Sequence, residues 1–87
     1  MPSKTNKALI VDEIRSFIME RCFLDEALLA EDAALFSSGV LNSADLVNIA
    51  LFIEEIYSIG IDGEEVTVES FDTLANMAGY IVKKTTD

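Results

Sequence analysis

Histidine and tryptophan are absent from this 87-residue chain, and cysteine and proline each occur once. Without histidine, neither a Ser-His-Asp nor a Cys-His nucleophilic site can be assembled from the chain. The lone Cys22 excludes an internal disulfide, and the usual Cys/His spacings of a zinc site are missing. We therefore expect no catalytic site and no metal site, and the cysteine usage is typical of a cytoplasmic protein.

Basic residues are scarce: 6 Lys and Arg stand against 16 Asp and Glu, which gives a formal net charge of −10. No Lys or Arg lies between residues 23 and 82. Because nucleic-acid affinity comes largely from Lys and Arg that neutralise phosphates, we expect no nucleic-acid partner. Two interpretations of the acidic stretch stay open: a solvated surface that keeps the protein soluble, and a docking surface for basic patches on partner proteins.

Long apolar runs are also missing. The longest, residues 49–53, is far below the roughly 20 residues that a membrane-spanning helix needs, so we expect no membrane insertion. Apolar residues nevertheless make up 51% of the chain, which argues against disorder, and the length suits one small core. The sequence therefore predicts one domain over residues 1–87, and we expect a monomer.

Apolar residues recur at three- and four-residue spacings in three segments, which predicts three longer helices. The first covers residues 7–21, the second begins at Asn42 and Ser43 and ends at Gly60, and the third covers residues 74–84. The stripe of the second helix that should be buried consists of Leu46, Ile49, Ala50, Ile53, Ile56 and Tyr57.

The connections between these segments have distinct signals. Residues 23–41 carry irregularly placed apolar residues and a Ser-Ser-Gly turn signal, which predicts a long loop anchored by its hydrophobic side chains. Further along, Thr67 or Ser70 can cap one short helical turn, and Asp72 or Thr73 can cap the last helix. Together the elements predict an all-α fold, a small four-helix bundle with three longer helices, one short helix and a long loop between helices one and two.

The expected start of the second helix carries the main candidate site. Asn42 and Ser43 are both preferred N-cap residues, and Asp45 in the first turn suits the positive end of the helix dipole. Val47 and Leu51 follow Ser43 by four and eight residues, so they share its face. One interpretation is a helix buried nearly all round, with Ser43 as its cap. The other is an exposed helix N-terminus, where backbone N–H groups and the dipole favour an attached or bound phosphate.

The residues LFSSGVLNSADLVNIALFIEEIYSIGI resemble the acyl carrier protein family, whose signature is a Leu-Phe-x-x-Gly-hydrophobic-hydrophobic-Asp-Ser stretch that opens its second helix. In this resemblance Ser43 occupies the position of the modified serine. Glu54 and Glu55 fall at the same offset from the serine as the acidic pair of the family, and SFDTLANMAGYI resembles the entry to its last helix. The resemblance covers nearly the whole chain and looks more like discrete carriers of aminoacyl or specialised pathways, including the D-alanyl carrier group.

The resemblance implies a function. It implies that a phosphopantetheinyl transferase attaches 4′-phosphopantetheine from coenzyme A to Ser43, and that the thiol of this arm holds acyl or aminoacyl groups as thioesters. The chain would then be a carrier protein of fatty acid or specialised metabolite biosynthesis and not an enzyme. Its further partners would be an acyl- or aminoacyl-loading ligase and downstream synthase or transferase enzymes with basic docking patches.

The resemblance also implies which residues of the second helix meet these partners. Val47 and Leu51 would be apolar contacts, and Asp45, Glu54 and Glu55 would meet basic residues. For each of these five the alternative is ordinary helix surface or partial core.

One departure from the family pattern lies beside the attachment point. Asn42 stands where the family usually has Asp, and it caps a helix equally well but removes one negative charge next to Ser43. Three outcomes therefore stay open at this position: recognition by a general-purpose transferase, recognition by a dedicated transferase, and loss of the modification. An acidic helical interaction module that docks basic partners without covalent modification stays open as the alternative function.

Overall fold

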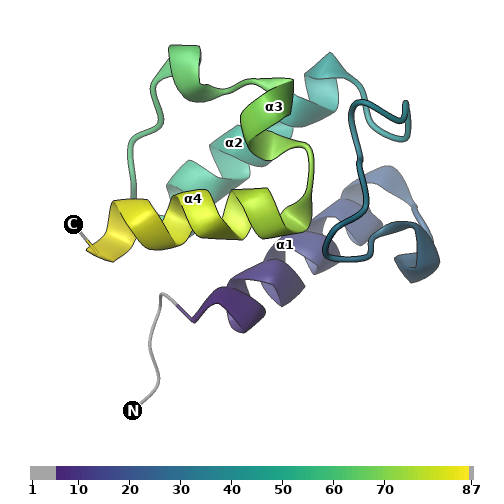
Figure 1. Ribbon diagram of the computed structural model, residues 1–87, viewed down its shortest axis with the longest axis horizontal. Helices are drawn as coiled ribbons and strands as arrows, with labels where there is room; N and C mark the ends of the chain where they lie inside the picture. The colour runs from purple at the N-terminus through teal and green to yellow at the C-terminus, as the bar shows by residue number, and fades with distance from the viewer. Residues whose placement is uncertain (1–5, 87) are drawn as a thin grey trace.

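The computed structural model describes residues 6–86, which form four α-helices and two short 3₁₀ helices (Figure 1). The helices are α1 (Lys7–Cys22), η1 (Glu26–Leu28), α2 (Ser43–Tyr57), η2 (Gly63–Glu65), α3 (Val68–Phe71) and α4 (Leu74–Thr86). No strand occurs within this part of the chain. The predicted all-α fold with three longer helices and one short one is therefore confirmed. None of the helices described is long and apolar enough to cross a membrane.

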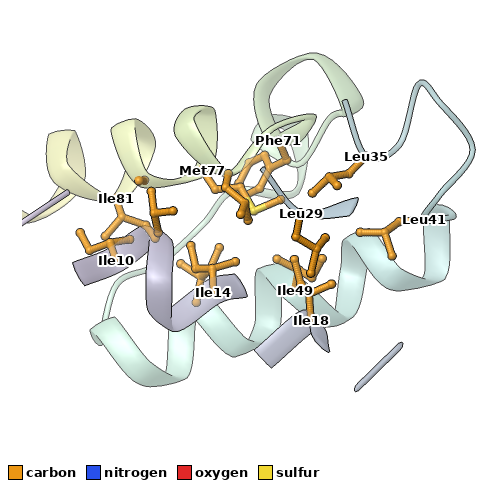
Figure 2. Packing of buried hydrophobic residues seen from close by; sticks show 14 of the residues in the cluster. Ile10, Ile14, Ile18, Leu29, Leu35, Leu41, Ile49, Phe71, Met77 and Ile81 are labelled. Atoms are coloured by element: carbon orange, nitrogen blue, oxygen red, sulfur yellow. The ribbon is translucent and has the colours of Figure 1, made fainter. Parts of the chain in front are cut away.

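The core lies where α1, α2 and α4 meet, and α3 packs on α4 (Figures 1 and 2). Each helix contributes side chains from one face only, at the three- and four-residue spacings that the sequence predicts. Burial of each such side chain contributes about 1.5 to 3 kcal/mol. The larger side chains that are fully buried are Ile10, Ile14, Ile18, Leu29, Leu35, Ile49, Ile53, Phe71, Leu74, Met77 and Ile81.

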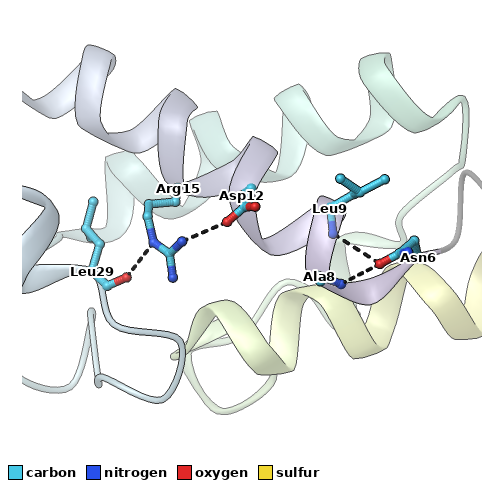
Figure 3. Close-up of polar contacts among 6 residues, drawn as sticks. All are labelled: Asn6, Ala8, Leu9, Asp12, Arg15 and Leu29. Atoms are coloured by element: carbon cyan, nitrogen blue, oxygen red, sulfur yellow. Dashed lines mark hydrogen bonds and ion pairs between the residues drawn. The ribbon is translucent and has the colours of Figure 1, made fainter.

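Helix α1 is held by polar contacts at its start and along its exposed side (Figure 3). The side chain of Asn6 caps it by accepting from the backbone N–H groups of Ala8 and Leu9, at 3.0 and 3.3 Å. Further along, Arg15 donates to the backbone carbonyl of Leu29 at 2.9 Å and pairs with Asp12 at 2.9 Å. Arg15 therefore ties the first connection to α1.

The first connection, residues 23–42, is anchored by some of its apolar residues and not by others. Leu29, Leu35 and Leu41 are buried in the core, as the sequence predicts. Phe23 and Leu28 are 91% and 48% exposed, so the expectation that the hydrophobic residues as a group anchor this loop is wrong for these two. Leu24, Phe36 and Val40 are partly buried and pack against the core.

Asp72 reaches across to this connection and does not cap α4. Its carboxylate accepts from the backbone N–H groups of Phe36 and Ser37, at 2.8 and 3.0 Å, and from the Ser37 hydroxyl at 2.6 Å. These bonds, first of all the one from the Ser37 side chain, lower the pKa of Asp72. Thr73 takes the capping role, because its Oγ1 accepts from the N–H of Asn76 at 3.0 Å. Of the two caps that the sequence allowed, Thr73 is the one used.

The end of α2 differs from the sequence prediction. The helix ends at Tyr57, and Ser58 adopts a left-handed conformation with φ of 54°, so Gly60 is not the residue that ends it. The early end has a physical reason, since Ile59 and Ile61 leave the helix to pack on the core. Their burial compensates for the roughly 1 kcal/mol that a left-handed residue other than glycine costs.

Candidate functional site

The start of α2 is held by two hydrogen bonds between Asn42 and Asp45, each from a backbone N–H to a side-chain oxygen. The Asn42 side-chain oxygen accepts from the N–H of Asp45, and the Asp45 carboxylate accepts from the N–H of Asn42, both at 3.0 Å. This is a capping box. Just before it, Leu41 is buried and its N–H donates to the carbonyl of Leu35 at 2.8 Å. The first turn of α2 is therefore positioned both by its own side chains and by the core.

Ser43 is the first residue of α2, and it is exposed. Because Asn42 supplies the cap, the interpretation of Ser43 as the cap is wrong. The Ser43 hydroxyl makes no hydrogen bond with any residue from 6 to 86, and neither do the N–H groups of Ser43 and Ala44. An unpartnered hydroxyl beside two unpartnered backbone N–H groups at a positively polarised helix end suits an oxygen that carries a phosphate.

Asp45 is half-buried, and its carboxylate is already used within the bundle. Besides the capping box, it accepts from the Cys22 thiol, with Sγ 3.8 Å from Oδ1. Burial raises the pKa of Cys22, and the charge and hydrogen bond of Asp45 raise it further. Cys22 therefore stays a neutral thiol and is not a competing nucleophile beside Ser43.

Val47 and Leu51 are exposed by 54% and 56% and lie on the same side of α2 as Ser43. The interpretation of α2 as a helix buried nearly all round is therefore wrong. Only one face of α2 is buried; its buried residues are Leu46, Ile49, Ala50 and Ile53. Ile56, which the sequence placed in this stripe, is 50% exposed. Tyr57, the other stripe residue of this last turn, is half-buried and packs against the core.

The structure separates the acidic pair Glu54 and Glu55. Glu54 is half-buried, and its carboxylate accepts from the N–H of Ile61 at 2.8 Å, so it holds the loop after α2. Glu55 is exposed and has no hydrogen-bond or ion-pair partner among residues 6–86. The predicted site residues therefore fall into two groups. Ser43, Val47, Leu51 and Glu55 lie at the surface, whereas Asn42, Asp45 and Glu54 also hold the local structure together.

The sequence did not predict the role of Asp72, whose side chain holds the connection that leads into α2. Asp72 fixes the turn around Phe36 and Ser37, which precedes α2 by a few residues. In the sequence Asp72 had the signal of a helix cap, and nothing local distinguished a cap from a contact with a loop 35 or more residues away. The turn itself had a signal, since Gly39 adopts the positive φ of 87° that a Ser-Ser-Gly turn allows.

The chain is 28% identical to an acyl carrier protein of Thermotoga maritima over 75 residues, which cover 86% of this chain and 90% of the relative. The predicted resemblance to acyl carrier proteins is confirmed. No family model matches the chain. The relative is named as a carrier protein.

Proposed function

We propose that this chain is a cytoplasmic carrier protein that bears 4′-phosphopantetheine on Ser43 and presents acyl or aminoacyl groups to partner enzymes. The observation that carries the proposal is the exposed Ser43 hydroxyl, without a hydrogen-bond partner among residues 6–86, at the first position of α2. The similarity to an acyl carrier protein over most of the chain supports it.

The residues around Ser43 fit a phosphodiester at its oxygen. The N–H groups of Ser43 and Ala44 have no acceptor among residues 6–86, and together with the helix dipole they stabilise negative charge at this end. Asn42 and Asp45 fix the turn that presents the hydroxyl. When attached, the group supplies a thiol that holds the acyl or aminoacyl cargo as a thioester.

The exposed side of α2 would supply partner recognition. Val47 and Leu51 offer apolar contacts next to Ser43, and Glu55 offers a carboxylate without an internal partner among residues 6–86. The partners are a phosphopantetheinyl transferase, a loading ligase, and downstream synthase or transferase enzymes that carry basic docking patches. Attraction between opposite charges raises the rate at which such partners meet, and this rate falls as salt is added.

The test is attachment of the arm in vitro. The chain is incubated with a broad-range phosphopantetheinyl transferase and coenzyme A, and its intact mass is measured. Wild type should gain the mass of one phosphopantetheine group and Ser43→Ala should gain none. Ser16→Ala is the matched control, because Ser16 is an exposed helical serine whose hydroxyl also lacks a partner among residues 6–86. This variant should be modified like wild type.

Two results would contradict the proposal: no mass gain in wild type, or the same gain in Ser43→Ala. Circular dichroism of Ser43→Ala should match wild type, since alanine is tolerated at the first helical position and Asn42 remains as the cap. If wild type is not modified but still binds partners, and Ser43→Ala binds them equally well, the alternative of an acidic interaction module without covalent modification replaces the carrier.

A further inference from the structure

A groove separate from the Ser43 side of α2 runs between α1 and α2. Its volume is about 780 Å³, within the range of specific binding sites. The floor is aromatic, because the rings of Phe17 and Phe52 stack with their centroids 3.9 Å apart. Leu9 and Ile56 line it as well, and they are 54% and 50% exposed. Exposed apolar residues gathered in a groove mark an interaction site more often than scattered ones do.

The groove lies on the other side of α2 from the serine. Phe52 is nine positions after Ser43, and at about 100° per residue this places the two on opposite sides of the helix. Val47 and Leu51, by contrast, stay within about 80° of Ser43. A partner in the groove therefore leaves the Ser43 side open.

The charged side chains among residues 6–86 that line the groove are all negative. They belong to Asp12, Glu13 and Glu20. Asp12 pairs with Arg15 and Glu13 accepts from Tyr57, whereas Glu20 is exposed and has no partner among residues 6–86. Outside the lining, the Arg21 guanidinium lies 5.9 Å from the centroid of the Phe17 ring. The three lining carboxylates favour a partner that carries positive charge.

A hydrogen bond also joins the two walls of the groove. The Tyr57 hydroxyl on α2 donates to the Glu13 carboxylate on α1. The bond restricts the movement of the two helices relative to each other, and a site whose walls are already ordered loses less entropy when a ligand binds.

We propose that this groove binds a basic amphipathic helix of a partner protein, with its apolar residues on Phe17, Phe52 and Ile56 and its Lys or Arg residues beside Glu20 and Asp12. An apolar helix face laid into a groove is a common mode of peptide recognition. A second copy of this chain fits poorly, because a two-fold contact through the groove would bring the carboxylates of both copies together. The proposal does not rest on modification of Ser43.

The experiment measures binding of a synthetic peptide of about 15 residues, long enough to form a helix, with Leu along one face and Lys on the other. Its fluorescence anisotropy is followed as wild type, Ile56→Lys and Leu28→Lys are titrated. The two variants add the same charge at apolar positions of similar exposure, 50% and 48%. Only Ile56 lines the groove.

Ile56→Lys should raise the Kd at least about tenfold, whereas Leu28→Lys should stay within about twofold of wild type. Glu20→Lys, which changes charge at an exposed site without touching the core, should also weaken binding. Salt should raise the Kd. An equal loss in Ile56→Lys and Leu28→Lys, or equal affinity for a peptide with Glu in place of Lys, would overturn the proposal. So would sedimentation showing that wild type alone is a dimer that Ile56→Lys dissociates.

Discussion

The two ends of α2 use their polar groups in different ways. At the start, Asn42 and Asp45 bond to each other's backbone N–H groups and leave the Ser43 hydroxyl unpartnered among residues 6–86. At the end, Glu54 bonds to the following loop and Tyr57 bonds to α1. The start is therefore stabilised mainly by contacts within one turn, which do not use the Ser43 hydroxyl. The end is stabilised by contacts with the rest of the bundle, which use the side chains of Glu54 and Tyr57.

The largest expected effect is a loss of stability when Leu41, the buried residue just before α2, is truncated. Leu41→Ala should lower the free energy of unfolding by about 2 to 5 kcal/mol, because Leu41 is buried and its removal leaves a cavity. The matched control is Leu51→Ala, which truncates an exposed leucine and should change stability by less than about 0.5 kcal/mol. Urea unfolding followed by circular dichroism measures both. Equal losses would mean that the two leucines share the same environment.

Next is the contact that holds the connection leading into α2. The lowered pKa of Asp72 means that folding favours its charged form. Its contribution to stability is therefore present above the ordinary pKa of about 4 and is lost as pH falls through the lowered pKa. Asp72→Asn should be less stable than wild type at pH 7, and the two should converge in acid. Unfolding measured from pH 7 to pH 2 checks this, and a constant difference would contradict it.

A smaller effect is expected from the cap of α2, which lies next to the Ser43 hydroxyl. Asn42→Ala should cost about 1 kcal/mol, because the N–H of Asp45 loses its acceptor. Asn42→Asp should keep the stability of wild type, since Asp caps equally well and its charge suits the helix N-terminus. Thermal melting of the two variants measures the difference. If Asn42→Ala were neutral, the start of α2 would be held by Leu41 alone.

The smallest expected effect is a difference in stability between variants of Glu54 and Glu55, two neighbours near the end of α2. Glu54→Ala should lower stability by about 1 kcal/mol, because it removes the acceptor of the Ile61 N–H. Glu55→Ala should change stability by less than about 0.5 kcal/mol, since Glu55 is exposed and lacks a partner among residues 6–86. If Glu55 meets partner enzymes, as the proposed function expects, its loss should instead slow transfer of the phosphopantetheine arm.

The candidate site was predictable from the sequence to the extent that it depends on local signals. Asn and Ser before an apolar helix predict its start, and the four-residue spacing places Val47 and Leu51 beside Ser43. The roles of Asp45 and Glu54 were not predictable to the same degree. Their carboxylates bond to Cys22 and to Ile61, and the sequence shows no sign of either contact.

By itself the sequence determined the helices, the acidic charge and the place of the serine, because periodicity, capping and composition act over a few residues. Only the tertiary structure decided that Ser58 and not Gly60 follows the end of α2, that Asp72 holds the first connection, and that Ile56 lines a groove instead of the core. These features depend on residues far apart in the chain. Local sequence signals do not decide which residue ends α2 or caps α4. The packing of α1 and of the loops against the core decides it.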